Sequence, residues 1–291
     1  MPVGVIDVGS NTVRLHVSKS GTEVHREKAL LRLGDPIERT GSIPADKLAE
    51  TAACVEEFVA IARKHGAESV EVLVASPGRQ AANGLDLIAR LEAASGVPVR
   101  LLSPQEEGRL AFVGALAVSR RGRTGLIAVC DVGGGSSQVT VGTRRDGVAW
   151  VRSVDIGSMR LASRLFPDDP PGDSAVDRAR VEVERILDGF LPPLPEVALA
   201  VGGSARAIRS IVGATLGADE LDEVAGILAR TPAKEISQLY DVHLERVRTL
   251  AAGAVILEAL QARLHAPLRV VRGGGVREGA AIELAANVKA A

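Results

Sequence analysis

The chain has 291 residues, of which 46% are apolar, 24% are charged and 2% are aromatic, and its formal net charge is −1. This composition is typical of a folded globular protein and excludes a disordered chain. The balanced charge argues against nucleic acid or an acidic membrane surface as a partner, and the few aromatic side chains argue against a platform for stacking single strands.

The cysteines and the N-terminal sequence indicate the compartment. Cys54 and Cys130 are the only cysteines, and both lie in apolar patterns that predict core positions in a reducing environment. The chain begins with a strand pattern, without the basic segment, apolar region and cleavage site of a secretion signal. No apolar stretch reaches membrane-spanning length. We therefore expect a cytoplasmic protein.

The first half of the chain alternates strand and helix patterns. Apolar runs and period-two alternation predict strands, whereas apolar stripes at helical spacing predict helices. The predicted strands are residues 3–8, 13–17, 23–33, 70–75 and 97–102. The predicted helices run from Ala45 to just before Gly66, over 85–94, and onward from Ser103.

The second half repeats this order. The predicted strands are residues 126–131, 137–141, 148–156, 197–201 and 268–271, and the predicted helices are 159–166, 175–190, one from Gly202, 255–264 and 277–288. Strands that end in glycine-rich turns and lead into helices predict an α/β fold. We expect two duplicated domains, residues 1–120 and 121–276, joined at a basic link of residues 119–123. The C-terminal helix, within residues 277–291, should pack back on the first domain.

Two strand ends carry the same motif, in which an Asp and an apolar residue precede a turn of small residues. Four such turns occur in all, and their candidate phosphate-binding residues are Gly9, Ser10, Asn11, Gly133, Gly134, Gly135, Ser136, Gly202, Gly203 and Ser204, with residues 273–275 as the fourth turn. Small side chains let backbone N–H groups approach an anion closely. A single turn of this kind indicates only a change of chain direction. Four of them in a duplicated chain predict a phosphate chain held in a cleft between the domains.

Asp7 and Asp131 precede the first two turns, where a carboxylate would repel phosphate. A Mg²⁺ ion between them, bound directly or through water, would neutralise both sides, because carboxylates and phosphates are its usual ligands. The alternative is that each carboxylate only caps or braces its hairpin turn.

Two side chains are candidates for the reaction itself. Ser103 and Glu106 fit a capping box, which gives Glu106 a structural role at the start of a helix. Glu107 is therefore the candidate general base, and the alternative is a solvated helix residue. Arg79 follows a strand end and could grip phosphate oxygens, or it could form a surface salt bridge.

Other motifs give weaker or negative indications. Arg14, Arg120, Arg121 and Arg123 are weaker candidates for phosphate contacts. The five histidines show no metal-ligand spacing, and the chain has neither a Walker loop nor a Gly-x-Ser-x-Gly elbow.

Taken together, the motifs resemble those of the exopolyphosphatase / guanosine pentaphosphate phosphohydrolase family, within the actin–Hsp70–sugar kinase superfamily, over nearly the whole chain. The matching segments are residues 7–15, 79–83, 105–110, 131–136, 202–204 and 276–279. The resemblance implies duplicated ribonuclease H-like (actin-like ATPase) domains with a ligand cleft between them and a tendency to form homodimers. It also implies that Glu107 is the catalytic base and that Arg79 binds substrate.

Two departures from the family pattern matter. Gln138 stands where the family has an acid after its second phosphate motif, which implies a weaker hold on the metal ion. The chain also resembles the short, two-domain members, which lack a C-terminal helical His-Asp domain.

We therefore expect a Mg²⁺-dependent exopolyphosphatase that releases terminal orthophosphate from short inorganic polyphosphate. Guanosine pentaphosphate is the alternative substrate. Two further alternatives are a small-molecule kinase of the same superfamily and, because of Gln138, a polyphosphate or nucleotide sensor that has lost turnover. Phosphate release without an acceptor would exclude the kinase, and tight binding without release would indicate the sensor.

Overall fold

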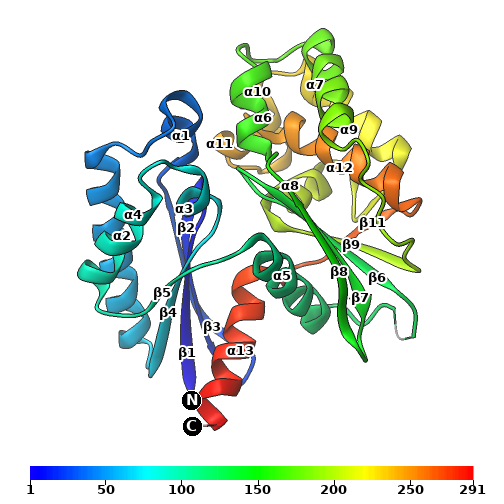
Figure 1. Ribbon diagram of the computed structural model, residues 1–291. Helices are drawn as coiled ribbons and strands as arrows, with labels where there is room; N and C mark the ends of the chain where they lie inside the picture. Colours follow the sequence, from blue (N-terminus) through cyan, green and yellow to red (C-terminus); the bar gives the residue numbers. More distant parts are fainter. Residues whose placement is uncertain (123, 291) are drawn as a thin grey trace. The chain divides into compact units, whose positions relative to one another are not determined.

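The computed structural model describes residues 1–122 and 124–290 (Figure 1). Contacts between residues divide the chain into two compact units. Unit 1 comprises Met1–Gly114 and the C-terminal segment from Val276, and unit 2 comprises Ala115–Gly275. The link expected at residues 119–123 lies just after the division between Gly114 and Ala115. Arg123, one of the candidate residues, lies outside the described residues. Within the described ranges, no helix is both long and apolar enough to cross a membrane.

Unit 1 is built on a five-stranded mixed sheet with the strand order β3-β2-β1-β4-β5. Its strands are β1 (Pro2–Val8), β2 (Thr12–Lys19), β3 (Thr22–Leu30), β4 (Ser69–Val74) and β5 (Val99–Leu101). The first three strands pair antiparallel, whereas β4 runs parallel to β1 and β5 runs parallel to β4. β1 is central and covered on both faces, which explains its nearly continuous apolar sequence.

Helices cover both faces of this sheet. They are α1 (Gly34–Thr40), α2 (Ala45–Lys64), α3 (Ser76–Gln80), α4 (Gly84–Ser95), α5 (Pro104–Val118) and α13 (Val276–Ala290). Ile6 and Val8 of β1 point into the core formed with α2 and α4. Val3 and Val5 point to the opposite face, into the core formed with α5 and α13.

Unit 2 repeats the arrangement around a six-stranded sheet with the order β10-β11-β9-β6-β7-β8. Its strands are β6 (Ile127–Val132), β7 (Ser137–Thr143), β8 (Gly147–Val154), β9 (Val197–Val201), β10 (Thr215–Leu216) and β11 (Leu268–Val270). The series β8-β7-β6-β9-β11 corresponds to β3-β2-β1-β4-β5 of unit 1, with the same parallel and antiparallel pairings. The predicted fold, two duplicated ribonuclease H-like α/β domains, is confirmed.

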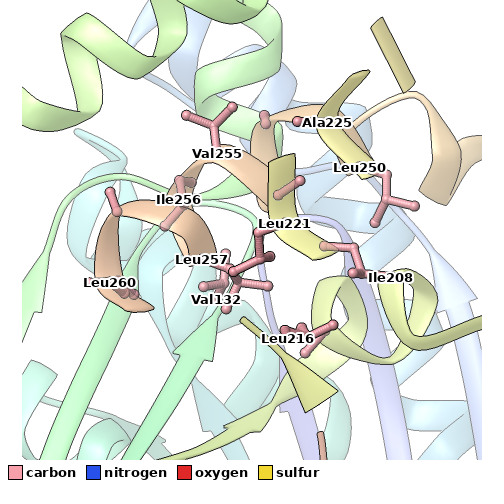
Figure 2. Packing of buried hydrophobic residues seen from close by; sticks show 14 of the residues in the cluster. Val132, Ile208, Leu216, Leu221, Ala225, Leu250, Val255, Ile256, Leu257 and Leu260 are labelled. Atoms are coloured by element: carbon pink, nitrogen blue, oxygen red, sulfur yellow. The ribbon is translucent and has the colours of Figure 1, made fainter. Parts of the chain in front are cut away.

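The core of unit 2 surrounds an apolar helix. The helices of this unit are α6 (Ser158–Leu165), α7 (Asp173–Ile186), α8 (Gly202–Val212), α9 (Ala218–Arg230), α10 (Ala233–Tyr240), α11 (Leu244–Val247) and α12 (Leu250–Leu264). α12 is buried on nearly all sides and packs against α6, α7, α8 and α9. Figure 2 shows Leu257 of α12 next to Val132, at the end of β6. This packing supports the strand ends that carry the turns of unit 2.

The structure differs from the expected elements in a few places. The third strand, expected to reach residue 33, ends at Leu30 because the next backbone N–H groups, of Leu31 and Arg32, donate to the carbonyl of Asn11 in the first turn. Arg32 adopts a positive φ of 54° at this point. The short helices α1, α3, α10 and α11 and the longer α9 were not expected from the pattern.

Candidate functional site

The two predicted hairpin turns share the same backbone geometry. In unit 1 the N–H of Gly9 donates to the carbonyl of Thr12 at 3.1 Å, and in unit 2 the N–H of Gly133 donates to the carbonyl of Ser136 at 3.0 Å. The second residue of each turn is held from behind by the chain that enters the next helix: Gly34 N–H donates to Ser10 O at 2.8 Å. Similarly, Met159 N–H donates to the Gly134 carbonyl at 3.0 Å. The sequence repeat therefore produces a structural repeat.

This arrangement leaves backbone donors at the tips of both turns. Within the described part of the chain, the N–H groups of Ser10, Asn11 and Gly134 donate to no protein acceptor. The carbonyls of Ser10, Asn11 and Gly134, in contrast, accept backbone hydrogen bonds. The Ser10 hydroxyl is buried and lies 2.7 Å from the Ser76 hydroxyl at the start of α3. The side chain of Ser10 therefore joins the turn to α3, and its backbone N–H donates to no acceptor among the described residues.

A glycine at the start of α6 supports the second turn. A Cβ atom on Gly157 would lie 2.3 Å from the carbonyl carbon and oxygen of Gly134, so no side chain fits there. Ser136, the last residue of the turn, is buried, and its hydroxyl accepts from Gln138 Nε2 at 3.1 Å. Gly133, Gly134 and Gly135 thus form a turn that is packed from behind by backbone.

Asp7 lies directly opposite Arg14 in the β1–β2 ladder, on the face of the sheet that α13 covers. Burial raises the pKa of the Asp7 carboxyl, and the positive charges of Arg277 and Arg14 oppose that effect. Arg277 belongs to the Arg-Glu-Gly segment singled out in the sequence, which thereby gains a role in balancing the charge of Asp7.

The glycine of the same segment brings two helices of unit 1 together. A Cβ atom on Gly279 would lie 2.0 Å from the carbonyl oxygen of Leu110, so α13 crosses α5 at backbone contact distance. Arg109 of α5 also forms a bidentate ion pair with Glu283 of α13. These contacts fix α5, which carries Glu107 in its first turn.

Asp131 occupies the equivalent position in unit 2, but its surroundings differ. The residue opposite it in the β6–β7 ladder is Gln138, a neutral amide, where unit 1 has Arg14. The carboxylate lies against the start of α8: a Cβ atom on Gly202 would be 2.5 Å from Asp131 Oδ1, and Gly202 has a positive φ of 89°. Gly202 is therefore required both for its backbone conformation and for the space it leaves.

Gly203, the next residue, makes room for an arginine that the sequence did not indicate. A Cβ atom on Gly203 would lie 2.6 Å from Nη2 of Arg246 in α11. Burial lowers the pKa of Arg246, and the nearby Arg206 of α8 lowers it further. Among the described residues, no ion pair joins Arg246 to a carboxylate. A partly buried guanidinium at the start of a helix, beside a second arginine, is a favourable environment for an anion.

The side chain of Ser204 lies inside unit 2. Its side chain is 0% exposed and its hydroxyl has no hydrogen-bond partner. The hydroxyl oxygen would lie 3.0 Å from a Cβ atom on Gly253, so the side chain fills the contact between α8 and α12. Any contact of Ser204 with phosphate would have to come from its backbone.

Arg79 and Glu107, predicted from separate motifs, meet in unit 1. Arg79 Nη2 donates to Glu107 Oε2 at 2.8 Å, and Arg79 Nη1 donates to the carbonyl of Leu102 at 2.7 Å. Both side chains are largely buried, with 16% and 12% of their surfaces exposed. This pairing excludes both simple alternatives, the fully solvated glutamate and the exposed surface salt bridge.

The predicted capping box fixes the first turn of α5. Glu106 Oε2 accepts from the Ser103 N–H at 2.9 Å and from the Ser103 hydroxyl at 2.7 Å. The Glu106 N–H donates back to the Ser103 hydroxyl at 3.2 Å. The hydrogen bonds from Ser103 lower the pKa of Glu106 and keep it ionised. Glu106 and Glu107 therefore have separate partners, as the sequence pattern indicated.

The remaining described candidates belong to unit 2. Arg120 and Arg121 are exposed beyond the end of α5. Gly273 and Gly274 have positive φ values of 76° and 68° in the turn that leads to α13. Within residues 1–122 and 124–290, no group of three or more His, Cys, Asp or Glu side chains forms a metal site from protein ligands alone.

Comparison with known proteins identifies relatives of the whole chain. The model of the Ppx/GppA phosphatase family matches residues 12–287. Exopolyphosphatase 1 of Mycobacterium tuberculosis is 30% identical over 305 residues, which covers 96% of this chain and 87% of that protein. The guanosine-5'-triphosphate,3'-diphosphate pyrophosphatase of Vibrio cholerae is 23% identical over 301 residues, covering 98% of this chain and 59% of that protein.

The fold has counterparts among solved structures. A Ppx/GppA family member from Aquifex aeolicus superposes with a TM-score of 0.82 at 24% identity, and the match covers 99% of this chain and 98% of that chain. At this level of identity the likeness establishes the two-domain α/β fold.

Proposed function

Because this chain belongs to the Ppx/GppA phosphatase family and is therefore a phosphoanhydride hydrolase, we propose that it releases terminal orthophosphate from inorganic polyphosphate. The observation that carries the proposal is the pair of matched turns, whose tips present the N–H groups of Ser10, Asn11 and Gly134. Backbone donors of this kind suit phosphate oxygens and do not depend on any other part of the substrate. Short chains are the preferred substrate in this proposal.

Glu107 is the proposed general base. Its carboxylate would take a proton from a water molecule as the water oxygen attacks the terminal phosphorus, and the bridging P–O bond would break in line with that attack. The products are orthophosphate and a polyphosphate shorter by one phosphate. A positioned base contributes about 10²–10⁴-fold to such a reaction, and the rest comes from positioning and charge neutralisation.

Arg79 is proposed to contact both the substrate phosphate and Glu107. Its guanidinium already contacts Glu107 and the carbonyl of Leu102, and a guanidinium carries five N–H donors in a fixed plane. Phosphate oxygens that bind to the remaining donors would be placed beside the Glu107 carboxylate. In unit 2, Gly202, Gly203 and Arg246 are proposed to bind phosphate oxygens in the same way.

Mg²⁺ is the proposed cofactor, and Asp131 is its better protein ligand. The charge of Asp7 is opposed by Arg14 and Arg277, whereas the position opposite Asp131 holds the neutral Gln138. Mg²⁺ commonly takes one or two carboxylates and completes its shell with waters and substrate phosphates, so a larger protein cluster is not needed. When bound, the ion would neutralise the phosphate charge that develops during cleavage.

Guanosine pentaphosphate is the second candidate substrate, favoured by the match to the Vibrio cholerae protein over 98% of this chain. One assay separates the candidates: orthophosphate release from polyphosphates of several lengths and from guanosine pentaphosphate, with and without Mg²⁺ and without any acceptor. Release from polyphosphate supports the proposal. Release from guanosine pentaphosphate alone would replace it, and binding without release would indicate a sensor.

A further inference from the structure

Asn83 forms an unusual link within unit 1. It stands at the N-cap position of α4, yet its side chain makes no capping hydrogen bond to that helix. Instead, its Oδ1 accepts from the Ile43 N–H at 2.9 Å and its Nδ2 donates to the Ile43 carbonyl at 2.8 Å. The amide thus pairs with both backbone groups of a residue that lies before α2.

This use of the side chain has a cost in local stability. An Asn at an N-cap normally accepts from the N–H groups of the first turn, which stabilises the helix. α4 forgoes that contribution because the Asn83 amide turns away from it. A residue that departs from the local preference in this way indicates a demand imposed by another part of the structure.

The position of Ile43 is fixed by its burial in the core. It is only 2% exposed, belongs to the hydrophobic core of unit 1, and precedes Pro44 at the start of the long helix α2. A second bond runs in parallel, from the Ala82 N–H to the Gly41 carbonyl at 2.8 Å. Together these bonds fasten the turn between α3 and α4 to a fixed point in the core.

The turn held in this way packs directly against α3. A Cβ atom on Gly84 would lie 2.1 Å from the carbonyl oxygen of Gly78, so α4 meets α3 at backbone contact distance. A Cβ atom on Gly78 would in turn lie 2.7 Å from Leu101 Cδ1. α3 is therefore confined between α4 and the sheet, and Arg79 follows Gly78 on this single turn of helix.

We propose that Asn83 is a positioning residue for Arg79. It holds the α3–α4 turn on Ile43 so that the Arg79 guanidinium stays within reach of Glu107 and of a phosphate oxygen. This inference rests on the proposed function only for its kinetic consequences. Its structural content is that the position of α3 depends on the Asn83–Ile43 pair.

The test uses Asn83→Ser with Ser95→Ala as a matched control. Serine is a good N-cap, so Asn83→Ser restores capping of α4 but is too short to pair with Ile43. Ser95→Ala removes the hydrogen bonds that the Ser95 hydroxyl donates to the Leu91 carbonyl and accepts from the Val97 N–H, at the other end of the same helix. Both variants perturb α4, and only the first releases the turn beside Arg79.

Steady-state hydrolysis of polyphosphate gives the first readout. We expect Asn83→Ser to raise KM about tenfold with kcat changed by less than about twofold, because a small misplacement of a binding group is enough to lose its contribution. Adding Asn83→Ser to Arg79→Ala should cause no further rise in KM. Independent, multiplying effects of the two substitutions, or a profile identical to that of Ser95→Ala, would overturn the inference.

Hydrogen exchange gives a readout that does not depend on activity. The Ala81 and Ala82 amides, bonded to the carbonyls of Pro77 and Gly41, should exchange faster in Asn83→Ser than in the wild type or in Ser95→Ala. Unchanged exchange would overturn the positioning role even if the kinetics change. Absence of hydrolysis in the wild-type chain, with faster exchange in Asn83→Ser, would overturn the proposed function and leave the positioning role supported.

Discussion

Arg79 Nη2 donates a hydrogen bond of 2.8 Å to Glu107 Oε2, so the candidate phosphate-binding residue and the candidate base are in direct contact. The two residues lie on different helices, α3 and α5, and each helix is held by its own contacts. Under the proposed function, a phosphate group that binds to Arg79 would be placed beside the Glu107 carboxylate. Substrate binding and proton transfer would then depend on the same arginine side chain.

Glu107→Gln should lower kcat by about 10²–10⁴-fold and leave KM nearly unchanged, because the base acts on water and need not contribute to ground-state binding. Glu106→Gln is the matched control. Its amide oxygen can still accept from the Ser103 N–H, which Glu106 now bonds at 2.9 Å, so turnover should stay within about twofold. Initial-rate measurements on both variants check the assignment. Loss of turnover in Glu106→Gln instead would exchange the roles of the two glutamates.

Arg79→Ala should raise KM by about 10–100-fold and lower kcat less, because a hydrogen bond to a charged group contributes about 1.5–3 kcal/mol to binding. Arg79→Lys keeps the charge but loses the forked geometry, so it should recover only part of the affinity. Saturation curves for both variants provide the measurement. A loss confined to kcat would place Arg79 at the reacting phosphoryl group.

Asp7→Asn should stabilise the protein increasingly as pH rises. The pKa of Asp7 in the folded chain lies above its ordinary value of 3.8, so the native state binds the proton more tightly than the unfolded chain does. That contribution is complete below pH 3.8 and is lost as pH rises through the native pKa.

Urea unfolding of wild type and Asp7→Asn at pH values from about 3 to about 7 checks this expectation. The free energies of unfolding should converge at low pH and diverge in favour of Asp7→Asn near neutrality. A variant less stable than wild type at neutral pH would mean that Arg14 and Arg277 more than compensate the burial of Asp7.

The paired hairpins could be predicted because their signals are local. The Asp, the apolar residue and the small-residue turn are contiguous at Asp7 and again at Asp131, and the strand alternation resumes directly afterwards. The capping box of Ser103 and Glu106 is equally local, since a helix start involves only its first four residues. Such signals need no knowledge of which segments pack together.

The contacts made by tertiary packing could not be predicted in the same way. Arg246 lies on α11, a helix of one turn without a hydrophobic pattern, and its contact with Gly203 depends on how α8 and α11 pack. The pairing of Asn83 with Ile43 likewise joins two segments far apart in the sequence, one before α4 and one before α2. The burial of Ser204 against Gly253 required knowledge of where α12 crosses α8.

Arg246→Ala should weaken phosphate binding without destabilising the fold. Burial lowers the pKa of the Arg246 guanidinium, and the charge of Arg206 lowers it further. The positive charge of Arg246 therefore costs the folded state free energy when no anion is bound. We expect KM for polyphosphate to rise about tenfold and the melting temperature to stay the same or increase. Calorimetric unfolding together with phosphate-release kinetics checks both parts. A large fall in melting temperature would indicate that Arg246 is structural.

The last prediction concerns Gln138, which lies opposite Asp131 and is 2% exposed. Its Nε2 donates to the hydroxyls of Ser136 at 3.1 Å and Ser153 at 3.0 Å, so the amide braces the second turn. In Gln138→Glu both hydroxyls can rotate to donate to the carboxylate, and the fold should persist with a loss of about 1–3 kcal/mol for the buried charge.

The same substitution places a second negative charge on the face of the sheet that carries Asp131, since directly opposed residues in an antiparallel ladder share a face. A cation bound at Asp131 would be held more strongly, so Gln138→Glu should lower the Mg²⁺ concentration that gives half-maximal phosphate release. Ser153→Ala is the control, because it removes one partner of Gln138 without adding charge. An unchanged Mg²⁺ dependence in Gln138→Glu, with a wild-type rate that is already fast, would show that the amide serves only to brace the turn.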